Sequence, residues 1–80
     1  MRVNEITTIF EDVDYKPVIS SWIEEIGYDG ENLYLKLLNG YEYVYYNFRE
    51  QDLDDLLNAE SHGSWYHTFI KGIYDYDRIA

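Results

Sequence analysis

The strongest constraint on the fold is a dipeptide, Asn39-Gly40, which separates two segments rich in leucine and tyrosine. Both residues tolerate positive φ angles, and Asn-Gly between such segments is the strongest short-range signal of a β-hairpin. The flanking segments, residues 33–38 and 41–46, contain the large apolar and aromatic side chains that suit a half-buried sheet. The sequence therefore predicts an antiparallel pair of strands.

The hairpin can close in two registers, and the register decides which side chains share a face of the sheet. A three-residue loop over 38–40, with Gly40 in a bulge, places the leucines of the first strand with the odd-numbered tyrosines. A two-residue loop places those leucines with Val44 and Tyr46. It leaves an exposed platform of four tyrosines: Tyr34, Tyr41, Tyr43 and Tyr45. We favour the three-residue loop because it gathers the large apolar groups toward one core.

A further strand is predicted ahead of the hairpin, over residues 18–28. Its residues Trp22, Ile26 and Tyr28 stand at even positions, as in a strand with one apolar face, and it ends at the turn signal Asp29-Gly30. Residues 1–17 form an extension in which residues 6–10 have the β-branched content of a strand. The apolar spacing of the extension also fits a helix, but we favour a strand because the region that follows is β-rich.

Two helices are predicted after the hairpin, where the apolar period becomes helical. Asn47 and Glu50 indicate an N-cap and its reciprocal partner, so the first helix should open near Phe48. Three leucines should face the sheet: Leu53, Leu56 and Leu57. Ser64 is expected to cap the second helix, after the break at Gly63. Its apolar residues form two neighbouring stripes: Trp65, Phe69 and Ile73, and Tyr66, Ile70 and Tyr74.

These elements predict a single α+β domain over residues 18–80. A three-stranded antiparallel β-meander, to which an N-terminal strand can add, is followed by two α-helices packed on the sheet. Eighty residues provide one hydrophobic core and no room for separate cofactor and substrate domains. Hydrophobic residues make up 46% of the chain, which favours folding despite a net charge of −10.

Composition also limits where the chain works and what it binds. The chain has no cysteine, so it can form neither a disulfide nor a thiolate zinc site, and we expect a cytoplasmic location. Its apolar runs are far shorter than the ~20 residues of a membrane span, and no signal-peptide profile is present. Sixteen acidic residues against six basic ones disfavour phosphate contacts with nucleic acid and favour a basic protein partner.

Six segments of the chain together resemble one known family. They are Ser20-Ser21, Ile26-Gly27-Tyr28-Asp29, Leu33-Tyr34-Leu35 with Asn39-Gly40, Tyr43-Val44-Tyr45, Asn58-Ala59-Glu60-Ser61-His62-Gly63 and Ile70 through Tyr74. In this order and spacing they resemble the KTSC domain, a module found at the C-terminus of some lysyl-tRNA synthetases and as small bacterial and phage proteins. The chain departs from the family at Asn47-Phe48-Arg49, where Val-Pro is usual, and residues 1–17 lie outside the resemblance. The family's function is unknown, and the attachment to a synthetase suggests RNA binding only by association.

Catalytic and metal chemistry find little support in the sequence. Ser61, His62, Ser64 and His67 lie close together, but no Gly-x-Ser-x-Gly or oxyanion-loop pattern accompanies them. His62 and His67 are five residues apart, which does not align two ligands on one helix face. We therefore expect no catalytic residue, no metal site and no cofactor, and a chain that is not an enzyme.

Two binding hypotheses remain. In the first, the acidic surface, which includes Asp52, Asp54 and Asp55 at the start of the first helix, engages a basic protein surface. In the second, single-stranded RNA or other nucleic acid stacks on the Tyr-x-Tyr hairpin through Tyr34, Tyr41, Tyr43 and Tyr45. Helix-dipole stabilisation explains the acidic run, and cross-strand packing explains the tyrosines, without any ligand.

Overall fold

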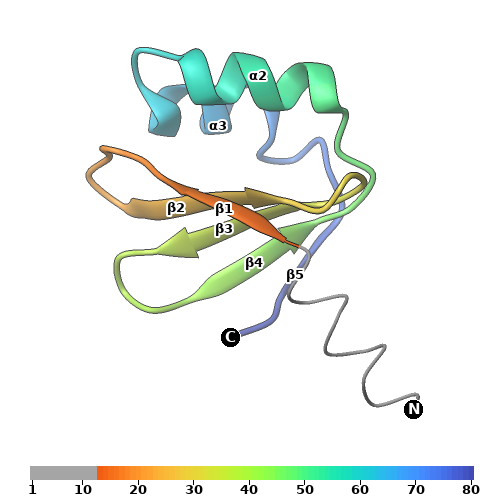
Figure 1. The fold of residues 1–80 in the computed structure, drawn as a ribbon, viewed down its shortest axis with the longest axis horizontal. Helices are drawn as coiled ribbons and strands as arrows, with labels where there is room; N and C mark the ends of the chain where they lie inside the picture. The colour runs from red at the N-terminus through yellow and green to blue at the C-terminus, as the bar shows by residue number, and fades with distance from the viewer. Residues whose placement is uncertain (1–12) are drawn as a thin grey trace.

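A computed structural model describes residues 13–80 and shows a five-stranded antiparallel sheet covered on one face by two helices (Figure 1). The strands pair in chain order, and both helices lie between the fourth and fifth strands. The strands are β1 (Asp14–Pro17), β2 (Ile23–Tyr28), β3 (Leu33–Leu37), β4 (Glu42–Tyr45) and β5 (Tyr76–Arg78). The helices are α2 (Glu50–Asn58) and α3 (His62–Phe69).

The predicted α+β class, with two helices following an antiparallel meander, is confirmed, but the prediction of three strands is wrong. An additional strand precedes the meander as β1, at residues 14–17, and it pairs with β2. The strand favoured for residues 6–10 lies outside the described residues. The fifth strand, β5, was not predicted because it has only three residues and follows directly on a helical apolar pattern.

The hairpin between β3 and β4 has the three-residue loop. The Leu37 amide donates to the Tyr41 carbonyl at 2.8 Å, and Leu35 lies opposite Tyr43. Gly40 adopts a φ of 94°, the left-handed conformation that this loop requires and that favours glycine. The leucines of β3 and the odd-numbered tyrosines of β4 therefore share the face beneath the helices, as predicted.

The hydrophobic core lies between that face and the helices. Buried side chains from β2, β3 and β4 meet three others: Phe48 before α2, Leu56 within α2 and Ile70 after α3. The core residues are Ile23, Ile26, Leu33, Leu35, Tyr45, Phe48, Leu56 and Ile70. Ile23 and Ile26 both point inward, although their spacing breaks strict alternation, because the β2–β3 register shifts between Ile23 and Glu25. This bulge is why the even-numbered pattern predicted for residues 18–28 holds only in part.

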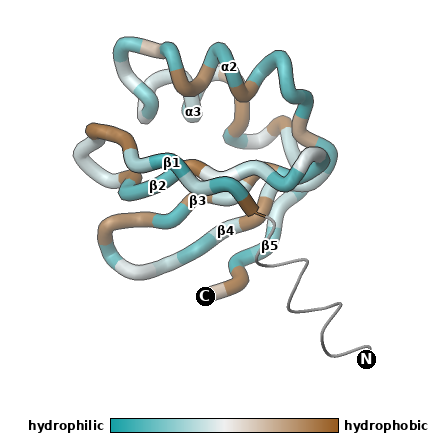
Figure 2. The backbone as a smooth tube through the Cα atoms, in the orientation of Figure 1, coloured by the Kyte–Doolittle hydropathy of each residue, from teal (hydrophilic) through white to brown (hydrophobic). Residues whose placement is uncertain are grey.

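The first helix begins later than predicted and without the predicted cap. The N-cap residue of α2 is Arg49, which makes no side-chain cap bond, and its backbone carbonyl accepts from Asp52 and Leu53. Asn47 instead adopts a left-handed φ of 56°, and its amide donates to Asn32 Oδ1. Leu56 is buried and Leu53 and Leu57 pack against the core, as predicted. Figure 2 shows the hydrophobic positions of α2 turned toward the sheet.

The second helix begins earlier than predicted, because Ser61 and not Ser64 is its N-cap. The Ser61 hydroxyl accepts from the Ser64 amide at 3.2 Å. The helix ends at Phe69, and Phe69 and Ile73 of the first predicted stripe are half exposed or more, whereas Trp65 packs against the core. The second predicted stripe faces the core, since Ile70 is fully buried and Tyr66 and Tyr74 pack against it. Within residues 13–80, no helix is long and apolar enough to cross a membrane.

Candidate functional site: an aromatic cleft beside the helices

An open cleft of about 460 Å³ lies on the helix-bearing side of the sheet. Five of its eight lining residues are aromatic and one is charged. The lining residues are Trp22, Leu37, Tyr43, Tyr45, Tyr66, Lys71, Gly72 and Tyr76, and we call this site the aromatic cleft. Its volume falls within the range typical of small-molecule sites, so it can enclose a ligand of modest size.

The sheet supplies one wall of the aromatic cleft. Tyr43 and Tyr45 are two residues apart on β4, so alternation directs both side chains to the helix side. Tyr76 lies directly across from Tyr45 on β5, and the two rings stack with centroids 5.5 Å apart. Tyr43 contacts Tyr76 edge to face at 5.9 Å. Strand pairing therefore holds three rings in a fixed cluster, of which Tyr76 is 58% exposed.

Trp22 and Tyr66 form the opposite wall. The Ser20 hydroxyl accepts from the backbone amides of Trp22 and Ile23, which fixes the turn that carries the indole. The indole contacts the Tyr66 ring of α3 edge to face at 5.1 Å, and it packs on the backbone of Gly63. These contacts join the turn before β2 to helix α3 within this wall.

A hydroxyl pair connects the walls at the base of the aromatic cleft. The Tyr45 and Tyr66 hydroxyl oxygens are 2.9 Å apart, and their rings meet edge to face at 5.8 Å. Tyr45 is only 4% exposed, while Tyr66 is partly exposed. Burial, followed by the hydrogen bond to Tyr66, raises the pKa of Tyr45 well above that of a free phenol. This hydroxyl therefore stays protonated at neutral pH.

Two cations flank the aromatic cleft in a strongly acidic protein. Lys71 lines it, and Arg78 lies opposite Tyr43 in the register with its guanidinium 4.5 Å from the centre of the Tyr41 ring. Three other basic residues form ion pairs with carboxylates: Lys16 with Asp14, Lys36 with Glu25, and Arg49 with Asp52. Lys71 and Arg78 have no such partner in the part of the chain that the structure describes. Within residues 13–80, the two basic side chains without an ion-pair partner therefore both lie beside the aromatic cleft.

The four predicted tyrosines do not form one surface. Tyr43 and Tyr45 line the aromatic cleft, and Tyr41 lies nearby at 44% exposure. Tyr34 lies on the opposite face, opposite Val44, where it is buried and its hydroxyl donates to Asp29. Since Tyr45 is also buried, the exposed platform of four hairpin tyrosines does not exist.

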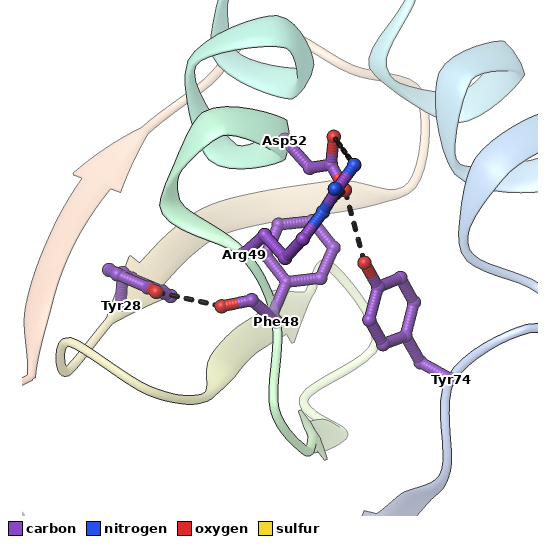
Figure 3. Close-up of polar contacts among 5 residues, drawn as sticks. All are labelled: Tyr28, Phe48, Arg49, Asp52 and Tyr74. Atoms are coloured by element: carbon purple, nitrogen blue, oxygen red, sulfur yellow. Dashed lines mark hydrogen bonds and ion pairs between the residues drawn. The ribbon is translucent and has the colours of Figure 1, made fainter.

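The three predicted aspartates also separate. Asp52 is partly buried, where its carboxylate accepts from the Tyr74 hydroxyl at 3.1 Å and pairs with Arg49 (Figure 3). This network joins the start of α2 to the segment after α3, so Asp52 has a structural role. Asp54 and Asp55 are exposed on the outer side of α2. They remain available for a partner.

Serine and histidine side chains at the helix junction cap α3, hydrogen-bond its backbone surroundings or pack against aromatic rings. Ser61 caps α3, and His62 Nδ1 lies 2.9 Å from the Leu56 carbonyl oxygen, which ties α3 to the end of α2. The His67 ring packs against Trp22 and Tyr66. Residues 13–80 contain no group of three or more histidine, aspartate or glutamate side chains placed to hold a metal ion.

Six of the eight residues that line the aromatic cleft were not singled out as site residues from the sequence: Trp22, Leu37, Tyr66, Lys71, Gly72 and Tyr76. Trp22 and Tyr66 were assigned to packing patterns, and Tyr76 depends on the unpredicted strand β5. Alternation at Asp75-Tyr76-Asp77-Arg78 was the available signal, but it spans too few residues to predict a strand. Lys71 gives no local signal, because its importance arises only from the tertiary fold.

Comparisons with known proteins agree with the architecture. The family model described as the KTSC domain matches residues 19–74. The crystal structure of a KTSC domain protein from Yersinia pestis superposes with a TM-score of 0.78 and 30% sequence identity, over 85% of this chain and 99% of that one. A protein of Tsukamurella paurometabola is 41% identical over 58 residues, which are 70% of this chain and 87% of that protein.

Proposed function

Given that the chain belongs to the KTSC domain family, we propose that it is a small non-catalytic binding module whose aromatic cleft binds single-stranded nucleic acid. One observation carries this proposal: the cleft combines five aromatic side chains with a lysine as its only charged lining residue. Bases stack on aromatic side chains, and a cation beside them suits a phosphate.

Stacking supplies the affinity in this proposal. Alanine substitution of stacking aromatics in single-strand binding proteins costs about 1–3 kcal/mol per base. Tyr76 is more than half exposed and Tyr43 is partly exposed, so both rings can receive a base without leaving their positions. Tyr45 is buried beneath them and supports Tyr76 by stacking. The preformed cluster avoids the entropic cost of ordering the rings on binding.

Phosphate contacts are few in this proposal. Among the basic residues within 13–80, Lys71 and Arg78 are the ones placed beside the aromatic cleft, while the whole chain carries a charge of −10. Each phosphate contact with a single strand contributes about −0.7 to the slope of log K against log salt, so two contacts give about −1.4. The proposal therefore entails a shallow salt dependence, in contrast to proteins that bind along a basic groove.

The non-catalytic part of the proposal is supported by the roles of the reactive side chains. Ser61 and His62, the closest serine and histidine pair in the sequence, are both hydrogen-bonded to backbone groups at the helix junction. Neither residue lines the aromatic cleft, which contains tyrosines, a lysine and apolar groups.

A fluorescence titration tests the proposed function. In a Trp65→Phe background, Trp22 is the remaining tryptophan and reports from the cleft wall. Addition of a short oligothymidylate should change its emission, and Tyr43→Ala should weaken binding at least tenfold. Tyr46→Ala is the matched control, because the Tyr46 hydroxyl bonds Asp77 away from the cleft. No binding, or equal losses in both variants, would overturn the proposal.

A basic protein partner is the second candidate, favoured by a different surface. The outer side of α2 exposes Glu50, Asp54 and Asp55, and the nearby Arg49 is already paired with Asp52. This surface should bind a lysine- and arginine-rich peptide at low salt. Asp54→Lys with Asp55→Lys should abolish that binding, whereas Tyr43→Ala should leave it unchanged. A peptide that binds the charge-reversed protein equally well would argue against this candidate.

A further inference from the structure

The Tyr45 and Tyr66 hydroxyl groups provide two O–H donors, and the hydrogen bond between them uses only one. The two oxygens are 2.9 Å apart, so one O–H lies between them and the other must point elsewhere. Neither hydroxyl has a second hydrogen-bond partner within residues 13–80. Among the described residues the pair therefore leaves one O–H without a protein acceptor, free to donate to water or to a ligand, and burial decides which residue carries it.

Burial assigns the shared proton to Tyr45. Tyr45 is 4% exposed, and a buried donor without an acceptor costs the desolvation free energy of that group. If Tyr45 donates to Tyr66, the buried proton is satisfied and the unused proton belongs to the more exposed residue. The reverse assignment strands a proton in the core. Tyr45 thus orients Tyr66 as a donor.

The Tyr66 side chain, with its free O–H, belongs to a site with two other chemical features. Tyr66 lines the aromatic cleft together with the stacked Tyr76 ring and with Lys71. A ligand that meets all three needs a flat ring, a hydrogen-bond acceptor on that ring and a negative charge. Aromatic anions without a ring acceptor satisfy only two of these requirements, and neutral heterocycles satisfy only two.

We infer that the aromatic cleft takes a single nucleotide unit, whose base stacks on the tyrosines and accepts a hydrogen bond from the Tyr66 hydroxyl while its phosphate meets Lys71. This inference rests on the proposed function and names the unit that is recognised. A volume of about 460 Å³ suits one nucleotide better than a run of several. Tyr45 is then a positioning residue, which acts through Tyr66.

Three small ligands separate the three requirements. Thymidine 5′-monophosphate has the ring, the acceptors and the phosphate. Its nonpolar analogue, with 2,4-difluorotoluene in place of thymine, keeps the shape and phosphate but loses the carbonyl acceptors. Thymidine keeps the base and loses the phosphate. Calorimetry or Trp22 fluorescence in the Trp65→Phe background measures the affinity for each.

Tyr66→Phe should weaken the affinity for thymidine 5′-monophosphate by about 2- to 10-fold, the usual effect of losing one hydrogen bond. The affinity for the difluorotoluene analogue should stay within twofold of the wild-type value. Lys71→Gln should weaken the affinity for both phosphate-bearing ligands and leave the affinity for thymidine unchanged. Lys16→Gln is the charge-matched control, because Lys16 is paired with Asp14 on β1. If Tyr66→Phe does not fold, the wild-type protein decides by its preference for the natural nucleotide, expected to exceed twofold.

The outcomes distinguish this inference from the proposed function. The inference alone is overturned if Tyr66→Phe loses affinity equally for thymidine 5′-monophosphate and for its difluorotoluene analogue. It is also overturned if the wild-type protein binds the two with equal affinity. Binding of oligothymidylate without measurable binding of the mononucleotide also overturns the inference and leaves the proposed function standing. Absence of binding by both the mononucleotide and the oligonucleotide overturns both.

Discussion

The Trp22 indole lies directly against the backbone of Gly63, so that a Cβ at position 63 would be 2.6 Å from its Nε1 atom. That contact joins the turn before β2 to the first turn of α3, and it fixes the position of the indole in the Trp22–Tyr66 wall of the aromatic cleft. Glycine at this helical position is unfavourable by about 1 kcal/mol relative to alanine. The close approach of the indole provides the compensating reason for it.

Gly63→Ala should therefore destabilise the protein, by about 1–3 kcal/mol, because the partly buried indole must move to admit the methyl group. Ser64→Ala, at the exposed neighbouring position, is the control and should be neutral or slightly stabilising. Urea unfolding measures both. An alanine at 63 that stabilises the protein would show that the Trp22 contact does not constrain α3.

Asp52 should matter for stability and not for docking. Asp52→Ala removes the acceptor of the Tyr74 hydroxyl and should cost about 1 kcal/mol. Arg49 is 68% exposed, so loss of its ion pair should add little. Asp54→Ala should stay within about 0.5 kcal/mol of wild type. Equal effects of the two substitutions in urea unfolding would contradict the structural role of Asp52.

The Tyr34–Asp29 contact should make stability fall in acid. Burial acts to raise the pKa of Asp29, but hydrogen bonds from the Asn32 and Glu31 amides and from the Tyr34 hydroxyl outweigh it and lower the pKa. A carboxyl with a lowered folded pKa stabilises the protein above its unfolded pKa of about 3.9 and loses that effect as pH falls below it. Tyr34→Phe should raise the pKa of Asp29, as measured by carboxyl NMR titration. An unchanged pKa would show that the Tyr34 bond does not contribute.

The same pair should make stability fall in alkali. Burial, with the hydrogen bond to Asp29, raises the pKa of Tyr34 to about 12. Its contribution is therefore complete below the unfolded value of about 10 and is lost as pH rises from about 10 to 12. Absorbance at 295 nm should show Tyr34 ionising above the exposed tyrosines. A Tyr34→Phe spectrum that loses its absorbance change near pH 10 instead would contradict this.

Local signals predicted the centre of the fold and missed its edges. The Asn39-Gly40 turn, the leucines of β3 and the inward leucines of α2 act through neighbours in the chain, so their pattern was sufficient. The strand β5 depends on tertiary pairing, in which Arg78 lies opposite Tyr43 across the sheet. The start of α3 was missed because Ser61 caps the helix ahead of Gly63, where a break was predicted. Glycine at position 63 leaves room for the Trp22 indole.

The candidate site was predictable only in part for the same reason. Tyr43 and Tyr45 were identified from their alternation in the hairpin, and the structure places both in the aromatic cleft. Their partners Trp22, Tyr66 and Tyr76 come from three separate segments that the fold brings together. Once the register was known, the alternation of side chains also placed Tyr34 on the opposite face of the sheet from Tyr43 and Tyr45.

The proposed binding of nucleic acid in the aromatic cleft is tested most directly by amide and indole chemical shifts in ¹H–¹⁵N NMR spectra during titration with a short oligothymidylate. Binding in the cleft should shift the Trp22 indole signal and the amide signals of Tyr66, Gly72 and Tyr76, and leave those of Tyr34 and Asp54 unaffected. Shifts confined to the outer side of α2 or to the opposite face of the sheet, or no shifts with excess oligonucleotide, would contradict it.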